Sequence, residues 1–388
     1  MTKLLTLSPF PPRLDASHGG ARSIAGLLTR LAVDHRVALL TLRARDEPPT
    51  GPEVASACEL LVEVERVVAR SSPRAVWRER QRLALALRRA PGWAVGFSVR
   101  AFALELERVI ARWRPDVVQI EYVIMGQYAH ALGDRPVVLV DHDASDASPE
   151  MLRLRTATAK AADAVVTFTE RDRAAVARLA PGTRVVRIPL AVDLPAAPLD
   201  ARGNGRDVVF VGNFEHPPNV EAAIRLARDI FPRVAESVPS ARLLLVGADP
   251  PKELRALASE KVAVTGHVAD LDPLLDAAAV VAAPLASGGG MRVKVLEALA
   301  AGKAVIATPL ALEGLDVSPG AQVVAAVDDR VFADEIVMLL RDGQRRVELG
   351  SAARAWAEAN VDWRRSSEAY ASLYSSLLAE REPPGSST

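Results

Sequence analysis

The chain has 388 residues, 49% hydrophobic and 25% charged, and its 48 basic and 48 acidic side chains cancel to a formal net charge of zero. This length allows two domains with sizeable cores. The balanced charge argues against a nucleic-acid-binding protein, which carries a strong basic excess. Cys58 is the only cysteine, which excludes disulfide frameworks and cysteine-based metal sites and favours a cytoplasmic protein.

Short apolar runs alternate with longer amphipathic segments, which is typical of a parallel sheet covered by helices. In the first half we expect strands at 3–7, 36–42, 116–122, 136–141, 164–169 and 184–189, with helices at 21–33 and 100–113 among them. In the second half we expect strands at 207–212, 241–247, 262–266, 279–285, 303–308 and 321–326, with a helix at 219–236. Prolines follow the first leucines too soon for a signal-peptide core, so that run is expected to be a buried strand.

Residues 191–206 separate the two halves. They are rich in Pro, Gly and Asp and show no hydrophobic period, which indicates an interdomain linker. We therefore predict an α/β protein with two Rossmann-like parallel-sheet domains, 1–193 and 206–362, facing across a cleft. A final helix at about 363–385 is expected to pack back on the first domain. Ligands on such sheets bind outside the carboxyl ends of the strands, which puts the expected site in the cleft.

The most informative stretch is 284–308, which reads as the end of the strand at 279–285, a glycine triplet at 288–290, a helix over 291–301 that ends at Gly302, and the strand at 303–308. Arg292 and Lys294 add positive charge where the helix dipole is already positive, which costs stability unless an anion is bound. Glycines let several backbone N–H groups converge on such an anion. Two cations suit a diphosphate better than a single phosphate, so we predict a phosphate-bearing ligand.

Lys294 and Glu297 lie three residues apart in the expected helix and therefore share a face. One interpretation is a surface ion pair worth less than about 0.5 kcal/mol. The other is that Lys294 reaches the phosphates while Glu297 accepts hydrogen bonds from a ribose diol. The glycine triplet has its own alternative, an ordinary flexible turn. Neither a GxGxxG nor a Walker lysine motif is present, which disfavours a nicotinamide oxidoreductase.

This stretch resembles the family-4 retaining glycosyltransferases, which have the GT-B fold. Similar segments occur in the family's order along nearly the whole chain, and they are PFPPRLDASHGGARSIAGLLTRLAVDHRVALLTL, RPDVVQIEY, VVLVDHDAS, VVFVGNFEHPPNVEA, LLLVGADPP, VAVTGHVADLDPLL and GGGMRVKVLEALAAGKAVIATPLALEGL. The last is the most specific. The resemblance implies a sugar transferase whose nucleoside-diphosphate sugar is held mainly by the second domain. The first domain would hold a glycan, lipid-linked or small-molecule acceptor.

The resemblance also assigns roles to residues of this chain. Arg292 and Lys294 would hold the diphosphate, and Glu297 would bind the ribose hydroxyls. The other implied donor contacts are the amides of Gly288, Gly289 and Gly290, the backbone around His267 and Val268, Gly212 and Asn213 on the phosphate side, and Gly19 and Gly20 from the first domain. Catalysis is assigned to Arg292, Lys294 and His142. No cofactor or metal is expected, because fixed cations can stabilise the charge that grows on the leaving diphosphate.

Two positions depart from the family pattern. Many members carry a second Glu eight positions before the matching Glu, where this chain has Gly289, so the donor sugar stays open. Many carry Arg after the first Gly of the second domain, where this chain has Asn213. Arg292 would offset that loss, as in the branch of the family with a Gly-Gly-Gly-x-Arg-x-Lys pattern.

A retaining enzyme of this kind implies that the acceptor attacks from the face that the leaving group departs, and that the leaving phosphate takes its proton. No dedicated nucleophile is then needed. His142, at the end of a first-domain strand, would hold the donor sugar or orient the acceptor, and its alternative is a structural histidine. Glu121 and Tyr122 are candidate acceptor contacts. Asp141 and Asp143 are the nearest approach to a metal-binding Asp-x-Asp motif.

The remaining signals leave alternatives open. His18 and His216 are expected to be loop and turn residues. Between Arg66 and Arg100 there are nine arginines against one acid, Glu79. This segment either lies on an anionic membrane surface, which would make the protein peripheral on the inner membrane face, or forms a solvated helical face. A non-catalytic or partner subunit with the GT-B fold and a sugar-nucleotide epimerase are the competing functions, although the six histidines of the chain are few for an epimerase.

Overall fold

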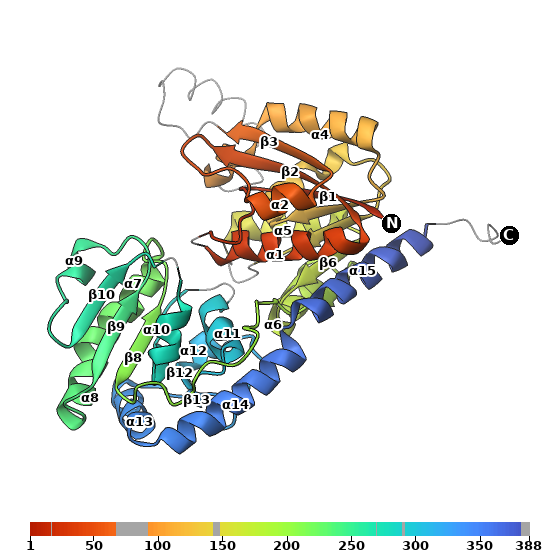
Figure 1. The fold of residues 1–388 in the computed structure, drawn as a ribbon. Helices are drawn as coiled ribbons and strands as arrows, with labels where there is room; N and C mark the ends of the chain where they lie inside the picture. Colours follow the sequence, from red (N-terminus) through yellow and green to blue (C-terminus); the bar gives the residue numbers. More distant parts are fainter. Residues whose placement is uncertain (17, 67–91, 143–147, 269, 289–291, 382–388) are drawn as a thin grey trace. The chain divides into compact units, whose positions relative to one another are not determined.

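The computed structural model describes residues 1–16, 18–66, 92–142, 148–268, 270–288 and 292–381. The chain divides into two compact units, each built on one parallel sheet covered by helices (Figure 1). The first unit comprises Met1–Leu190 together with the last helix, α15 (Trp363–Ala379), and the second comprises Ala191–Gly288 and Arg292–Asp362. The predicted α/β class with two Rossmann-like domains is confirmed.

The sheet of the first unit has seven strands in the spatial order β3-β2-β1-β4-β5-β6-β7, and neighbouring strands are parallel. Its strands are β1 (Lys3–Ser8), β2 (Arg36–Ala44), β3 (Leu60–Arg66), β4 (Val117–Glu121), β5 (Val137–Val140), β6 (Ala164–Thr167) and β7 (Arg184–Arg187). Its helices are α1 (Gly19–Asp34), α2 (Pro52–Ala57), η2 (Gly92–Phe97), α4 (Arg100–Trp113), η3 (Val123–Ala131), α5 (Pro149–Ala161) and α6 (Glu170–Leu179), in addition to α15.

The sheet of the second unit has six strands in the order β10-β9-β8-β11-β12-β13, again with parallel neighbours. Its strands are β8 (Asp207–Val211), β9 (Arg242–Val246), β10 (Val262–Gly266), β11 (Val280–Ala283), β12 (Val305–Ala307) and β13 (Val324–Ala325). Its helices are α7 (Pro217–Arg225), the π turn η4 (Leu226–Ile230), α8 (Phe231–Ser237), α9 (Lys252–Arg255), α10 (Asp272–Ala277), α11 (Val293–Ala300), α12 (Pro309–Leu312), α13 (Asp329–Arg341) and α14 (Gly343–Asn360).

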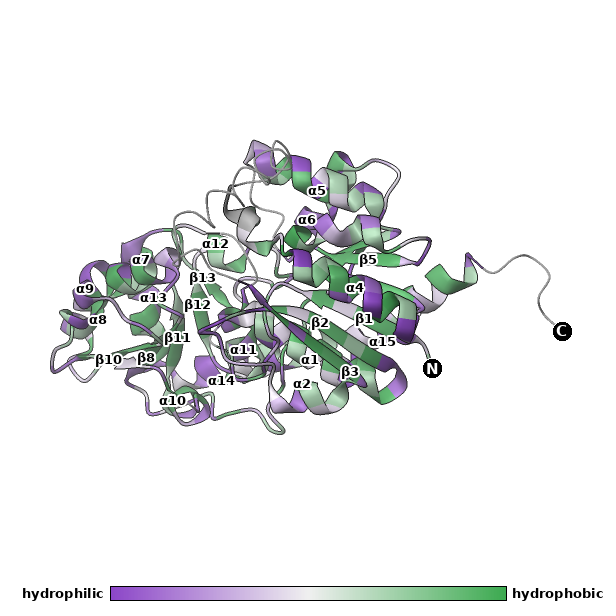
Figure 2. Cartoon of the chain, turned by 90° about the horizontal axis from the view of Figure 1, so that it is seen from above, coloured by the Kyte–Doolittle hydropathy of each residue, from purple (hydrophilic) through white to green (hydrophobic). Residues whose placement is uncertain are grey.

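The central strands read as continuous apolar runs because helices cover both faces of a parallel sheet. Strands β4, β5 and β6 are buried at every position, and Figure 2 shows hydrophobic strands flanked by helices of mixed hydropathy. In each sheet the strand order reverses once, between β1 and β4 in the first unit and between β8 and β11 in the second. The chain leaves these two strands in opposite directions along the sheet, and in open α/β sheets ligands bind at the carboxyl ends of such strands.

The helix predicted over 219–236 is present but interrupted. It forms α7 and α8 with the π turn η4 between them, just before Pro232. Proline has no N–H to donate and its ring crowds the carbonyl four residues back, and widening the preceding turn relieves both problems.

Helix α11 is shorter than the predicted span of 291–301, and Arg292 is the residue that caps its N-terminus rather than part of its first turn. At its other end Gly302 has a φ of 75°, in the left-handed region that favours glycine. The N–H groups of Gly302 and Lys303 donate to carbonyls of the last turn, which closes a Schellman cap and confirms the expected glycine stop.

Part of the expected linker is tied to the second unit. The ammonium of Lys303 is fully buried and donates hydrogen bonds to the carbonyl oxygens of Asp200 and Asp276, the latter at 3.1 Å. Burial lowers the pKa of Lys303 to about 8. The guanidinium of Arg346 donates to the carbonyl oxygen of Arg202 at 2.9 Å. Because buried cations need such partners, the segment around Asp200 is an ordered part of this unit.

Helix α15 packs against α1 within the first unit. Gly26 of α1 lies directly under the indole of Trp363, which begins α15, and the guanidinium of Arg30 lies 4.8 Å from the centre of the same indole. A Cβ atom on residue 26 would lie 2.3 Å from Cζ2 of Trp363. Only glycine therefore allows α1 and α15 to approach this closely.

We expect Gly26→Ala to lower the free energy of unfolding by about 1–3 kcal/mol, because the added methyl group overpacks the contact with Trp363. Urea unfolding followed by circular dichroism measures the change. The matched control is Gly26→Ala in a Trp363→Phe background, where the smaller ring leaves room and the cost of the alanine should shrink. An equal cost in both backgrounds would contradict this packing.

Candidate functional site

In the second unit the predicted phosphate-side residues lie at the carboxyl end of β8, where the strand order reverses. Gly212 directly follows β8 and is buried, and a Cβ atom there would lie 3.1 Å from Cγ of Asn219 on α7. The side-chain amide of Asn219 donates to the carbonyl oxygen of Asn213 at 2.7 Å. The loop after β8 and the start of α7 are thus held together by one carboxamide.

Lys294 of α11 reaches the same place from the far side of the reversal. Its ammonium donates a hydrogen bond to Oδ1 of Asn219 and lies 5.2 Å from the centre of the Phe210 ring. Burial, and secondarily the charge of Arg292, lower the pKa of Lys294 to about 8, while the carboxylate of Glu297 acts in the opposite direction. The side chain that holds this ammonium is therefore Asn219, and Glu297 influences it through its charge.

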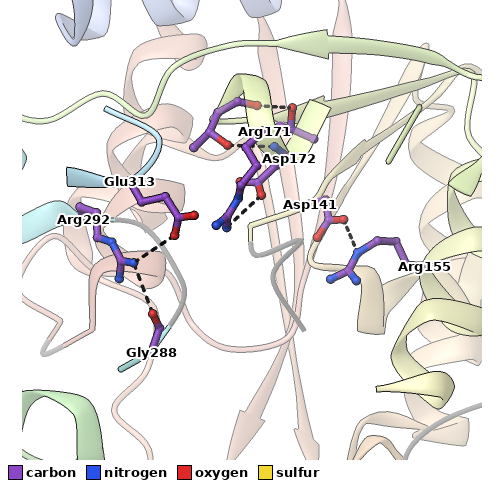
Figure 3. Close-up of polar contacts among 9 residues, drawn as sticks. Asp141, Arg155, Arg171, Asp172, Gly288, Arg292 and Glu313 are labelled. Carbon is purple, nitrogen blue, oxygen red and sulfur yellow. Dashed lines mark hydrogen bonds and ion pairs between the residues drawn. The ribbon is translucent and has the colours of Figure 1, made fainter. Parts of the chain in front are cut away.

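Arg292 contributes a second cation next to Lys294. Its side chain is 7% exposed, and Nη2 donates to the carbonyl oxygen of Gly288 at 3.3 Å (Figure 3). The same guanidinium lies 3.9 Å from the carboxylate of Glu313. Two desolvated cations side by side repel one another, so this end of α11 is electrostatically suited to an anion.

The other predicted residues of the second unit are placed as follows. Gly288 has a φ of 92°, which favours glycine, and a Cβ atom there would lie 2.8 Å from Pro218 of α7. His267 is exposed and Val268 half-buried directly after β10. Gly289 and Gly290 lie outside the described residues.

In the first unit, aromatic side chains gather where β1, β4 and β5 end. The rings of Tyr122 and His142 are stacked, with centroids 3.9 Å apart, and Phe10 meets Tyr122 edge-on at 5.3 Å. Tyr122 has a φ of 66°, an uncommon conformation for a bulky residue that costs free energy. A Cβ atom on Gly20 would lie 2.0 Å from the hydroxyl oxygen of Tyr122. The predicted glycine pair, Gly19 and Gly20, therefore begins α1 where a phenol lies directly against it.

His142 is 5% exposed and is the second residue after β5. Its Nε2 atom lies 2.6 Å from Oε2 of Glu121, and Phe168 packs edge-on against its ring at 5.2 Å. Its Nδ1 atom is buried with no hydrogen-bond partner among the described residues. Glu121 is 1% exposed and binds His142, so the candidate acceptor contact assigned to Glu121 is replaced by a supporting one.

His18 lies in the loop just before α1, as expected, and its Nδ1 accepts a hydrogen bond from the N–H of Ala21 at 3.2 Å, which caps the helix. Asp141 forms a buried ion pair of 2.7 Å with Arg155 (Figure 3), which occupies the first acid of the Asp-x-Asp-like pair, while Asp143 lies outside the described residues.

The described ranges contain no group of three or more His, Cys, Asp or Glu side chains that could hold a metal ion. They also contain no helix both long and apolar enough to pass through a bilayer. Most of the arginine-rich segment, residues 67–91, is outside these ranges.

The sequence reasoning missed Asn219, which orients Lys294, and also Gln119 and Tyr374, which support Glu121. Asn219 had a usable signal, since it follows two prolines that start a helix at the carboxyl end of a strand. Tyr374 had none, because its partner Gln119 lies 255 residues away in the chain.

Two family models match this chain and together span most of it. Residues 17–195 match the model described as Glycosyltransferase Family 4, and residues 205–342 match the model described as Glycosyl transferases group 1. A phosphatidyl-myo-inositol mannosyltransferase of Mycolicibacterium smegmatis is 31% identical over 198 residues, which are 47% of this chain and 49% of that protein. Its counterpart in Mycobacterium leprae is 31% identical over 166 residues, 41% of this chain and 43% of that protein. This chain spans about half the length of the curated relatives it matches, or somewhat less.

Solved structures share the fold over their full length. A sucrose-phosphate synthase from Thermosynechococcus elongatus superimposes with a TM-score of 0.73 at 18% identity, covering 98% of this chain and 100% of that one. The HepE protein of Anabaena in complex with UDP-glucose gives a TM-score of 0.70 at 16% identity, covering 97% and 100%. The two domain matches, their order and this shared two-sheet architecture show that the chain belongs to the family-4 glycosyltransferases of the GT-B fold.

Proposed function

We propose that the protein transfers a glycosyl group from a nucleoside-diphosphate sugar to a hydroxyl acceptor, with retention of configuration and without a metal ion. The observation that carries this proposal is the pair of adjacent cations, Arg292 and Lys294, at the carboxyl-end edge of the second sheet. The HepE structures contain UDP and UDP-glucose, which supports a nucleotide-sugar donor for a chain of this fold.

In the proposed reaction, breaking the bond from sugar to diphosphate leaves growing negative charge on the diphosphate oxygens. Cations held in place before the reaction stabilise this charge without reorganising, which is the largest catalytic term in many enzymes. Lys294 is oriented by Asn219 and Arg292 by Gly288. Glu297, on the same helix as Lys294, would accept hydrogen bonds from the ribose hydroxyls.

The first unit would supply the groups that meet the sugar and the acceptor. His142 is the candidate for a hydrogen bond to a hydroxyl, because its Nδ1 atom lacks a partner among the described residues. The acceptor would be a glycan, a lipid-linked molecule or a small molecule. Because some relatives are named phosphatidyl-myo-inositol mannosyltransferases, a lipid acceptor is the first candidate to test. Peripheral membrane contact would be tested together with it.

A thermal-shift screen of nucleoside diphosphates and their sugars identifies the donor, because a ligand that binds only the folded state raises its melting temperature. Release of sugar from that donor, with and without candidate acceptors, then tests the reaction. A donor that binds tightly and is never cleaved, with any acceptor offered, would favour the non-catalytic subunit.

We expect Lys294→Ala and Arg292→Ala each to lower turnover by about a hundredfold, the order of effect seen when one charge-stabilising group is lost. Steady-state kinetics with the donor from the screen measures the change. Lys252→Ala is the matched control, since Lys252 is an exposed cation on α9 of the same unit. Wild-type turnover in a folded Lys294→Ala or Arg292→Ala variant would refute the diphosphate assignment.

The affinity for a diphosphate should depend on pH through Lys294, whose pKa in the free protein is lowered to about 8. Below that pH the ammonium is charged and affinity is flat. Above it the protein must take up a proton to bind, so affinity should fall by up to about tenfold per pH unit. Calorimetric titration with UDP between pH 7 and pH 9.5 tests this.

Lys294→Arg is the control for the pH titration, because a guanidinium stays charged over the whole range. Its affinity for UDP is expected to stay flat above pH 8, whatever its absolute value. The same decline in the arginine variant would show that another group causes the pH dependence.

A further inference from the structure

We propose that Tyr374, Gln119 and Glu121 form a buried hydrogen-bond relay that sets the tautomer and the ring orientation of His142. The relay leaves Nδ1 of His142 as the ring atom offered to a hydroxyl of the sugar or the acceptor. This inference rests on the proposed function for its catalytic consequence, while its structural content can be tested without any substrate.

The donors and acceptors of the relay follow one another without a gap. The hydroxyl of Tyr374 donates to Oε1 of Gln119, and the amide of Gln119 donates to Oε1 of Glu121. Oε2 of Glu121 lies 2.6 Å from Nε2 of His142. All four side chains are buried, with exposures between 0% and 5%. Because these side chains are shielded from water, each polar atom needs a hydrogen-bond partner. Breaking any hydrogen bond of the relay therefore costs folding free energy.

The direction of each hydrogen bond is determined by chemistry. An amide nitrogen can only donate and an amide oxygen can only accept, so Gln119 must face its carbonyl toward Tyr374 and its NH₂ toward Glu121. A carboxylate oxygen accepts hydrogen bonds, so Oε2 of Glu121 accepts one from the N–H at Nε2 of His142. The proton of the neutral imidazole is therefore on Nε2, and the lone pair is on Nδ1.

The ring plane of His142 is fixed by two aromatic neighbours. Tyr122 stacks on the imidazole at 3.9 Å with an interplanar angle of 3°, and Phe168 meets its edge at 5.2 Å. The strained φ of 66° at Tyr122 is what brings its ring onto His142 immediately after Glu121 leaves the sheet. Strain of this kind persists only where the surroundings over-determine it, and it clusters at functional sites.

The free end of the arrangement is Nδ1. It is a buried polar atom with no partner among the described residues, although the rest of the relay is completely paired. Buried unpaired groups are rare in folded proteins and call for an explanation. Because three residues cooperate to leave that one atom without a proton and in a fixed direction, a ligand hydroxyl is the partner for which this geometry is suited.

The test is a nitrogen–proton correlation spectrum of the histidine rings of the full chain, with the His142 signal assigned by its loss in His142→Asn. We expect neutral His142 to carry its proton on Nε2. His130 is a control in the same spectrum, because its Nδ1 lies 2.9 Å from the carbonyl oxygen of Gln127 and must carry the proton in the neutral form. Opposite tautomers for these two histidines are the expected result, and a proton on Nδ1 of His142 would overturn the relay.

Glu121→Gln is the decisive variant. Its new amide can donate to Nε2 while its carbonyl still accepts from Gln119, so the proton of His142 should move to Nδ1 without loss of the fold. Turnover should then fall by about tenfold to a hundredfold with little change in KM for the donor, because Nδ1 would carry a proton and could no longer accept a hydrogen bond from the hydroxyl. An unchanged tautomer in Glu121→Gln would refute the relay.

Tyr374→Phe tests the far end of the relay, because it frees Gln119 to rotate while leaving Glu121 unchanged. We expect a smaller loss of turnover, roughly threefold to tenfold, since one neutral hydrogen bond is removed. Tyr370→Phe is the matched control, a buried tyrosine one turn earlier on α15 with no hydrogen bond to Gln119 or Glu121 among the described residues. Equal losses in the two variants would indicate a packing effect and overturn the role of Tyr374.

These readouts separate the relay from the proposed function. The tautomer is measured on the free protein, so the expected spectra combined with no sugar transfer by the wild type would support the relay and refute the transferase. A moved proton in Glu121→Gln with wild-type turnover would overturn the catalytic consequence while the transferase stands.

Discussion

The single reversal of strand order in each parallel sheet is the constraint on which the rest of this structure depends. The carboxyl ends of parallel strands lie at the same edge of a sheet. Where the strand order reverses, the connections leave the two neighbouring strands in opposite directions, and ligands bind at that position. In the second unit this brings Asn213, Asn219 and Lys294 together from opposite sides of the reversal. In the first unit it brings Gly20 to Tyr122, whose ring stacks on His142. Gly212, Tyr122 and His142 follow strands at these edges, and Gly20 and Lys294 lie in the first turns of helices beside them.

At both of these sheet edges, residues are held in states that lower the stability of the fold. Lys294 is kept where burial lowers its pKa, next to the further cation Arg292. Tyr122 is kept at a positive φ, and Nδ1 of His142 is kept without a partner among the described residues. Each of these costs folding free energy. The surrounding elements supply the stability that holds them in place.

The last helix, α15, contacts both the first helix and the residues that support His142. Helix α15 contacts α1 through Trp363 and Gly26, and it brings Tyr374 to Gln119 in the middle of the first sheet. The contact is a packing one at the start of the helix and a polar one further along it. A first unit without α15 would therefore lose a covering helix and the outer end of the relay at once.

The sequence by itself determined the α/β class, the two sheets, the helix over 100–113 and the glycine that ends α11, because hydrophobic period and turn chemistry act locally. The sequence also indicated that Gly212, Tyr122 and His142 would lie at the ends of strands. The tertiary structure alone decided that Asn219 holds Lys294 and that Glu121 binds His142. These partners lie in different elements. Local sequence preferences do not determine which side chains the folded sheet brings within hydrogen-bond distance. Tyr374 and Gln119 are the clearest case, since only the packing of a helix against a distant strand joins them.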